Sequence, residues 1–228
     1  MNVTAPGMIR ATGLAAVLAG LTFVVIQPIH PADVLASVST DAWAIIHYAS
    51  LVMVMLFLVG IVGIYARQVE KLGWLGLAGL VLLSLGLLLT AALGVVEVFV
   101  APLLVESEPD FVHGFLGMVG GHPTDADLGA MPLLWSASSV GFLGGTLLFG
   151  IANLRAGVLS RWASGVFAFG LLASAPVVGL LGAPRLAAVP VGIGLAWLGY
   201  SLWSERREPA TAPVLEAGTP QPDPVAAG

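Results

Sequence analysis

The chain has 228 residues, of which 58% are hydrophobic and only 9% are charged. Soluble domains carry about 25% charged residues, so this composition excludes a water-soluble globule and predicts a multipass α-helical membrane protein in a lipid bilayer. The net charge of −5 comes with scattered basic residues, which gives no support to a nucleic-acid partner, and the absence of Cys excludes disulfides, thiolate metal sites and a cysteine nucleophile.

Long apolar runs separated by short polar turns follow one another along the chain. Each is long enough for a transmembrane helix of about 20 residues, and their continuity argues against a transmembrane barrel. The first run exceeds the apolar core of a signal peptide and is interpreted as a retained helix. Together, the six apolar runs predict an all-α protein with a single six-helix transmembrane domain over residues 1–204. The predicted spans are residues 9–27, 43–65, 72–100, 132–154, 158–181 and 184–203.

The longest interruption lies between the third and fourth runs, at residues 102–131, and contains no Lys or Arg. Asp110 can cap a short helix within it, in which Phe111 and Phe115 share an apolar face. We predict that this segment forms a lid over the helices, although it could simply shield helix ends from water.

The basic residues predict the orientation in the membrane, because cytoplasmic loops are enriched in Lys and Arg. All of them except Arg185 fall on one side of a six-span topology. Both termini are therefore expected in the cytoplasm and residues 102–131 outside it. The Pro-rich residues 205–228 are predicted to be a disordered cytoplasmic tail. Abundant Ala and Gly with an excess of Arg over Lys are typical of high-GC bacteria, which suggests a bacterial inner (plasma) membrane.

Small residues at helical spacing predict close helix packing. Gly141 and Gly145 form a GxxxG pair, and Ala16 and Gly20 form a looser equivalent. Such pairs serve packing within one chain as readily as oligomerisation, so they leave the oligomeric state open. The predicted turns after the second and fourth spans share a Gly-Ile, Arg and Trp pattern, which indicates either a parallel duplication or the convergence of two cytoplasmic turns.

The candidate polar cluster lies on the outer side, where all four histidines are expected. His47 and Glu97 are equally distant from the inner turn near residue 70, so two antiparallel helices would place them at the same height. They are the candidate catalytic or proton-accepting pair. Alternatively, His47 bonds a helix carbonyl and Glu97 emerges into water. The full predicted cluster is His30, His47, Glu97, His113, His122 and Arg185.

Arg185 is the sole basic residue predicted on the outer side, among many acidic residues. Coulomb attraction is therefore expected to pair it with an outer carboxylate, and the candidates are Glu97, Glu106, Glu108 and Asp110.

The same residues do not predict a metal or a cofactor. Imidazoles and carboxylates suit zinc, copper or iron, but their spacing here matches no recognised site, and neither HExxH nor His-x3-His occurs. Only His47 lies convincingly in a helix, whereas bis-histidine haem needs two facing histidines. Nucleophile and phosphate-loop motifs are also missing from the sequence.

The overall pattern resembles a family of uncharacterised six-helix integral membrane proteins found in actinobacteria and some archaea, which has no established activity. The resemblance covers most of residues 8–204 and implies a fold but no site. It is carried by QPIHP (27–31), DAWAIIHY (41–48), GIYARQ (63–68), EKLGWLG (70–76) and LFGIANLRAGVLSRWA (148–163).

Three classes of function are compatible with the sequence. A binding, sensory or accessory membrane component, with a small molecule or lipid as ligand, ranks first. A membrane enzyme would use His47 and Glu97 on a lipid-soluble substrate in the outer leaflet. A small-solute transporter would need a polar path through the membrane, whereas the inner halves of the spans carry only isolated Ser, Thr and Asn153.

Overall fold

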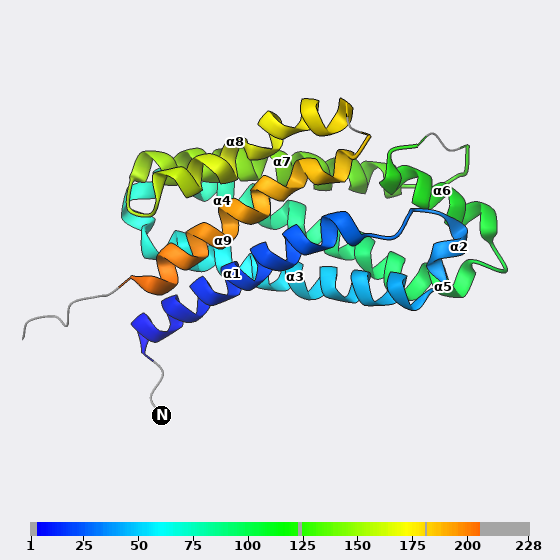
Figure 1. Cartoon of the computed structure of the whole chain (residues 1–228), viewed down its shortest axis with the longest axis horizontal. Coiled ribbons are helices and arrows are strands. Elements are labelled where there is room, and N and C mark those ends of the chain that lie inside the picture. Colours follow the sequence, from blue (N-terminus) through cyan, green and yellow to red (C-terminus); the bar gives the residue numbers. More distant parts are fainter. Residues whose placement is uncertain (1–3, 123–124, 181, 206–228) are drawn as a thin grey trace, which may run out of the picture.

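The computed structural model describes residues 4–122, 125–180 and 182–205, and these residues form helices joined by short connections (Figure 1). The predicted tail beyond residue 205 lies outside the described residues. The long helices are α1 (Ala5–Ile29), α3 (Asp41–Arg67), α4 (Val69–Val95), α7 (Met131–Ala156), α8 (Arg161–Leu180) and α9 (Val189–Ser204). The short ones are α2 (Leu35–Val38), the π-helix η1 (Val96–Val100), α5 (Ala101–Leu104), α6 (Pro109–Gly120) and the 3-10 helix η2 (Pro184–Ala188).

Within the described residues, 5 helices are long and apolar enough to cross a membrane. The chain is therefore a polytopic membrane protein, as its composition predicts. The predicted span at residues 158–181 corresponds to α8 (Arg161–Leu180), which is not among these candidates, so the count of six spans stays a prediction. The membrane-spanning candidates are Pro6–Ile29, Asp41–Arg67, Val69–Leu104, Met131–Ala156 and Arg185–Ser204.

The third predicted span differs from the observed helix at both ends. It begins earlier, at Val69, because Gly73 absorbs a break in α4 with a φ of 57°, a conformation that favours glycine. It also continues without interruption through η1 and α5 to Leu104. A π-helix shifts the helical register of the residues that follow it, and such segments are frequent at functional sites.

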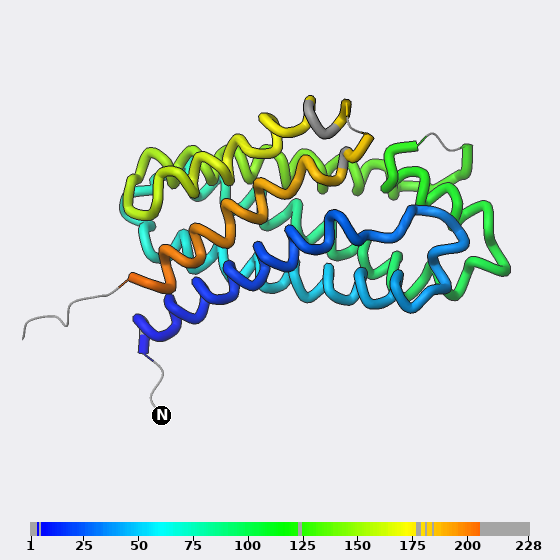
Figure 2. The backbone as a smooth tube through the Cα atoms, in the orientation of Figure 1, coloured from blue at the N-terminus to red at the C-terminus, as the bar shows by residue number. Residues whose placement is uncertain are grey.

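The long helices contact one another in a closed order. α1 packs against α3 and α9, α4 packs against α3 and α7, and α8 packs against α7 and α9. Figure 2 shows α1 and α9, the first and last of these helices, side by side along most of their length. Both ends of the described chain lie at one end of the molecule, whereas α2, α5 and α6 gather at the opposite end (Figure 1). We call the latter the α6 end.

Glycines allow the closest of these helix contacts. A Cβ at Gly145 of α7 would lie 2.3 Å from the backbone nitrogen of Leu83 in α4, and a Cβ at Gly86 would lie 2.4 Å from the nitrogen of Phe142. The predicted Gly141–Gly145 pair therefore serves packing within this chain, against α4. In α1, a Cβ at Gly20 would likewise approach α9, at 2.4 Å from the carbonyl oxygen of Gly192.

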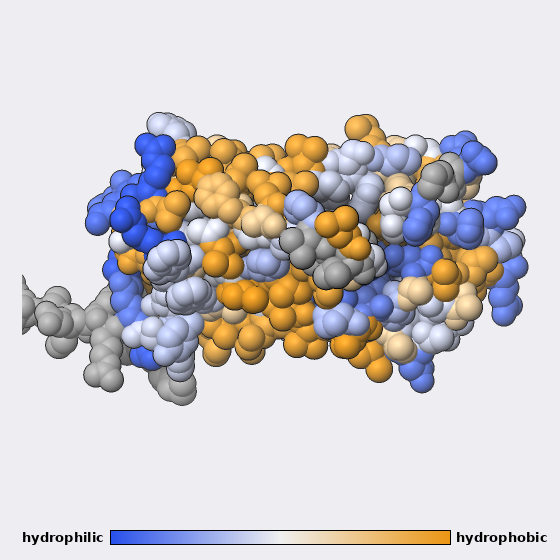
Figure 3. All heavy atoms as spheres, turned by 45° about the horizontal axis from the view of Figure 1, so that its top comes forward, coloured by the Kyte–Doolittle hydropathy of each residue, from blue (hydrophilic) through white to orange (hydrophobic). Residues whose placement is uncertain are grey.

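The surface carries the pattern expected of a bilayer-spanning protein. Figure 3 shows apolar side chains over the middle of the visible face and hydrophilic ones toward its two ends. Exposed residues of α4 include Val81, Leu85 and Leu88, each about half exposed. Lipid tails are as apolar as these side chains, so their exposure on the surface is compatible with stability in a membrane.

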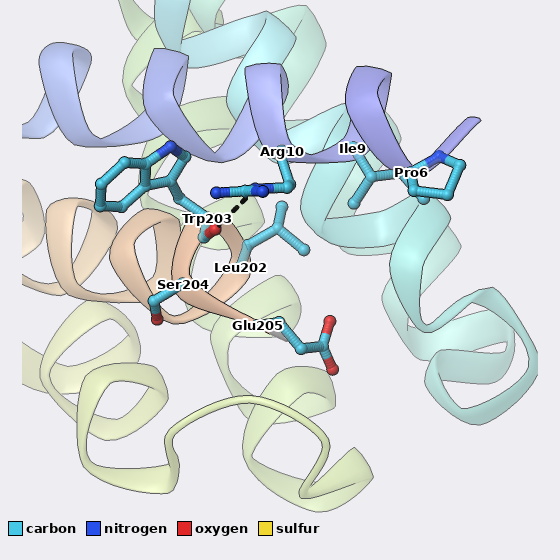
Figure 4. Close-up of a pocket in the computed structure, with 7 residues that line it drawn as sticks. All are labelled: Pro6, Ile9, Arg10, Leu202, Trp203, Ser204 and Glu205. Carbon is cyan, nitrogen blue, oxygen red and sulfur yellow. Dashed lines mark hydrogen bonds between the residues drawn. The ribbon is translucent and has the colours of Figure 1, made fainter. Parts of the chain in front are cut away.

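Polar contacts hold together the end opposite α6. Arg67 of α3 makes a bidentate ion pair with Glu205, with nitrogen–oxygen distances of 2.6 and 2.5 Å. Nε of Arg10 donates to the carbonyl oxygen of Trp203 at 3.2 Å, across a surface hollow between α1 and the last turn of α9 (Figure 4). A cationic donor there satisfies a carbonyl that the end of α9 leaves without an intrahelical partner.

Candidate functional site

A cavity of about 190 Å³ lies between α1, α3 and α4, toward the α6 end. Its polar lining includes four of the predicted residues, His30, His47, Glu97 and Arg185. A second cavity of about 200 Å³ shares lining residues with it, among them Phe23, Thr90 and Trp135, and is mainly apolar. The two are therefore contiguous, with a polar end and an apolar end.

His47 is placed by the first turns of α3. The hydroxyl of Thr40 caps this helix by accepting from the backbone N–H of Trp43 at 3.2 Å. The Nδ1 atom of His47 lies 2.8 Å from the carbonyl oxygen of Trp43. Its ring also stacks on the Trp43 indole, with 3.9 Å between centroids. The helix-carbonyl bond weighed for His47 is therefore present, and it leaves Nε2 facing the cavity side.

Glu97 reaches His47 as the sequence predicts. Its Oε2 atom lies 3.8 Å from Nε2 of His47, and its side chain is 19% exposed. The residue lies in η1, and its backbone carbonyl accepts from Nε1 of Trp43 at 3.0 Å. Trp43 thus fixes both members of the pair, one through its backbone and ring and the other through its indole N–H.

His30 adds a second imidazole to the same end of the cavity. Its ring lies edge-on to that of His47, with 4.9 Å between centroids, and its Nδ1 lies 2.7 Å from the carbonyl oxygen of Pro31. Burial lowers the pKa of His30, and the nearby Arg185 cation lowers it further. The neutral imidazole is therefore the favoured form in the folded protein.

Arg185 pairs with a carboxylate, as expected, but the predicted partners are wrong. Its guanidinium donates to Asp33, in the connection between α1 and α2, and not to Glu97, Glu106, Glu108 or Asp110. The Asp33 side chain is only 9% exposed, whereas that of Arg185 is 41% exposed. This ion pair links the connection before α2 to η2, next to the cavity that Arg185 lines.

The remaining predicted residues do not join this cluster. His113 on α6 and His122 just after it are exposed and are not among the cavity-lining residues. Within the described residues, no group of three or more His, Asp or Glu side chains has an arrangement that could hold a metal ion. α6 contributes an apolar residue instead, since Val119 lines the cavity.

Aromatic rings close the bundle beyond the apolar end of the cavity. Phe23 and Phe142, which line that end, are stacked with 6.2 Å between centroids. Phe57 lies edge-on to both, and Phe167 and Phe149 extend the contacts across the bundle. Phe57, Phe149 and Phe167 are fully buried. This aromatic layer separates the cavity from the opposite end of the molecule.

The fold and site together define a polytopic α-helical membrane protein with a partly open cavity that is polar at one end and apolar at the other. The chain matches no protein-family model, no curated protein and no solved structure. The resemblance to the uncharacterised six-helix family therefore stays a prediction, and the functional argument rests on the geometry of the site.

Proposed function

We propose that this protein is a membrane binding component that holds a small amphiphilic molecule in the cavity between α1, α3 and α4. The observation that carries the proposal is the division of this space, with His30, His47, Glu97 and Arg185 at one end and an apolar second cavity beyond it. Binding sites for small molecules commonly combine an apolar lining with a few convergent polar groups. The head group of the ligand would meet the imidazoles and the carboxylate, and its apolar part would extend toward Phe142.

The aromatic layer is the reason that we favour binding over transport. A transporter needs a path that reaches the other side of the membrane, and its substrate site lies near the midplane. Here the rings of Phe23, Phe57 and Phe142 contact one another beyond the cavity. A molecule entering from the α6 end would stop at this layer.

We further propose that the α6 end faces away from the cytoplasm of a bacterium, with α6 as a lid on the cavity, because every basic residue that the structure describes, except Arg185, lies toward the opposite end. The chain has no Cys, so a single introduced cysteine reports its own location. In intact spheroplasts, a membrane-impermeant maleimide is expected to label Ser107→Cys in the connection before α6 and not Glu70→Cys at the start of α4. Both should react after permeabilisation. Labelling of Glu70→Cys alone would reverse the orientation.

The proposed binding is tested by photolabelling the protein in lipid nanodiscs with a medium-chain alcohol that carries a diazirine. We expect saturable labelling of cavity residues such as Met53 or Trp135. Thr90→Phe should abolish it, because Thr90 lines both cavities and a phenyl ring would fill their junction. Leu88→Phe is the matched control, since Leu88 lies on the same helix and is 51% exposed.

The photoreactive alcohol also reaches the lipid-facing surface from the bilayer. Mapping the labelled peptides distinguishes labelling in the cavity from labelling on that surface. Labelling confined to exposed residues, or cavity labelling that Thr90→Phe leaves unchanged, would overturn the proposed function. Ala91→Leu offers an independent filling variant, because Ala91 also lines the cavity and is 8% exposed.

A further inference from the structure

His47 and Glu97 present two hydrogen-bond acceptors to the same cavity. Nδ1 of His47 lies against a carbonyl oxygen and must carry the proton, so in the neutral ring Nε2 carries a lone pair. The His47 side chain is 3% exposed, and its Nε2 has no hydrogen-bond partner among the described residues. An ionised Glu97 carboxylate can only accept as well. When Glu97 is ionised, both atoms therefore need donors from a third group, and they are 3.8 Å apart.

The fixed charges around the cavity do not neutralise Glu97. The guanidinium of Arg185 is already engaged by Asp33. Across the described residues, no Lys or Arg forms an ion pair with Glu97. With neutral imidazoles and an ionised Glu97, the groups at the polar end sum to one negative charge. A largely buried carboxylate is costly unless a cation accompanies it, so a positively charged ligand would fit this end best.

We infer that the cavity selects a lipophilic amine, whose ammonium group bridges Nε2 of His47 and the carboxylate of Glu97. A primary ammonium supplies three N–H donors and a positive charge, whereas a hydroxyl supplies one donor and no charge. The hydrocarbon part of the amine lies in the apolar cavity, which Trp135 and Phe142 line. The inference rests on the proposed function, because it names the ligand class for the same cavity.

Competition against the photoreactive alcohol tests the two contributions separately, with the whole protein in nanodiscs at neutral pH. Octylamine supplies charge and N–H donors, octyltrimethylammonium supplies charge without N–H donors, and 1-octanol supplies a single O–H donor. Each compound is measured by the mole fraction in the bilayer at which it halves the labelling. For octylamine this mole fraction is expected to be about tenfold lower than for either of the others, as bonds to an ionised group would give.

Two variants assign this preference to the pair. His47→Ala should reduce the advantage of octylamine over octyltrimethylammonium, because it removes one of the two acceptors that need an N–H. Glu97→Gln keeps the shape of the side chain and should remove the advantage of octylamine over 1-octanol, because it removes the charge. Glu108 is an exposed residue just before α6, so Glu108→Gln is the control. It should leave the advantage of octylamine over each of the other two compounds unchanged. If His47→Ala fails to fold, the isosteric Glu97→Gln still decides the outcome.

The two proposals fail in different ways. An absence of saturable cavity labelling refutes the proposed function and with it the amine. Saturable labelling with equal competition by the three compounds leaves the binding function intact and refutes the amine, since the His47–Glu97 pair would then satisfy itself through a proton on Glu97. A preference that survives Glu97→Gln also refutes the inference.

Discussion

Gly145→Ala in α7 is expected to lower the stability of the protein markedly. The added Cβ would lie 2.3 Å from the nitrogen and 2.4 Å from the Cα of Leu83, and both are backbone atoms that no side-chain rotation can move. α4 and α7 would have to separate, which costs about 1–3 kcal/mol for overpacking of this kind. The unfolding temperature of the purified protein in detergent or nanodiscs measures the loss.

Gly165→Ala is the matched control for this change. Gly165 also lies in a long helix, α8, but an added Cβ there meets nothing within 4 Å. Alanine favours a helix over glycine by about 1 kcal/mol, so the control variant should be as stable as the parent or slightly more stable. An equal unfolding temperature for Gly145→Ala and Gly165→Ala would contradict the interpretation that α4 and α7 depend on backbone contact.

Most of the fold follows from two features of the sequence, the length of the apolar runs and the position of small residues. The runs predict the long helices because a backbone in lipid must satisfy its own hydrogen bonds. Their ends are less predictable. Gly73 permits α4 to begin three residues earlier than its apolar run, and η1 allows the helix to continue past Val100. Neither the break at Gly73 nor the π-helix η1 alters the hydropathy of the sequence, from which the ends of the spans are predicted.

The central pair of the site is predictable in part, because α3 and α4 are antiparallel neighbours joined by a short turn at Gln68. His47 precedes that turn by 21 residues and Glu97 follows it by 29, so equal distance from the turn does not by itself explain their contact. Trp43, which bonds to both, was missed. A tryptophan four residues before a histidine in a helix is the signal that could have indicated it, since residues at that spacing share a face.

The partner of Arg185 was not predictable in the same way, because it depends on the path of a connection. Glu106 and Glu108 are exposed on the α6 end, whereas Asp33 is held in a buried position before α2. His113 and His122 belong to the predicted cluster only because the predicted topology places them on the same side of the membrane. Side of the membrane is a coarse constraint, and it does not bring side chains within bonding distance.

Arg185→Gln is expected to destabilise the α6 end and to loosen the cavity beside it. The variant would leave the Asp33 carboxylate, 9% exposed and with an Oδ1 that has no hydrogen-bond partner among the described residues, without its cation. Loss of one partner of a buried pair can cost about 3–5 kcal/mol, but the exposure of Arg185 reduces this toward about 1–2 kcal/mol. Because the pair joins η2 to the connection before α2, dissociation of the cavity-bound photoprobe should also become faster.

The double variant Asp33→Asn/Arg185→Gln separates a lost attraction from an exposed charge. Asp33→Asn removes the buried charge, so the double variant should recover much of the unfolding temperature that Arg185→Gln loses, and the two single effects should not add. Asp33→Asn alone should be milder than Arg185→Gln alone, because the guanidinium that remains can turn toward water, while a stranded Asp33 carboxylate cannot. Additive effects in this cycle, measured by unfolding temperature and probe dissociation together, would show that Asp33 and Arg185 act independently and that their contact does not hold the two connections together.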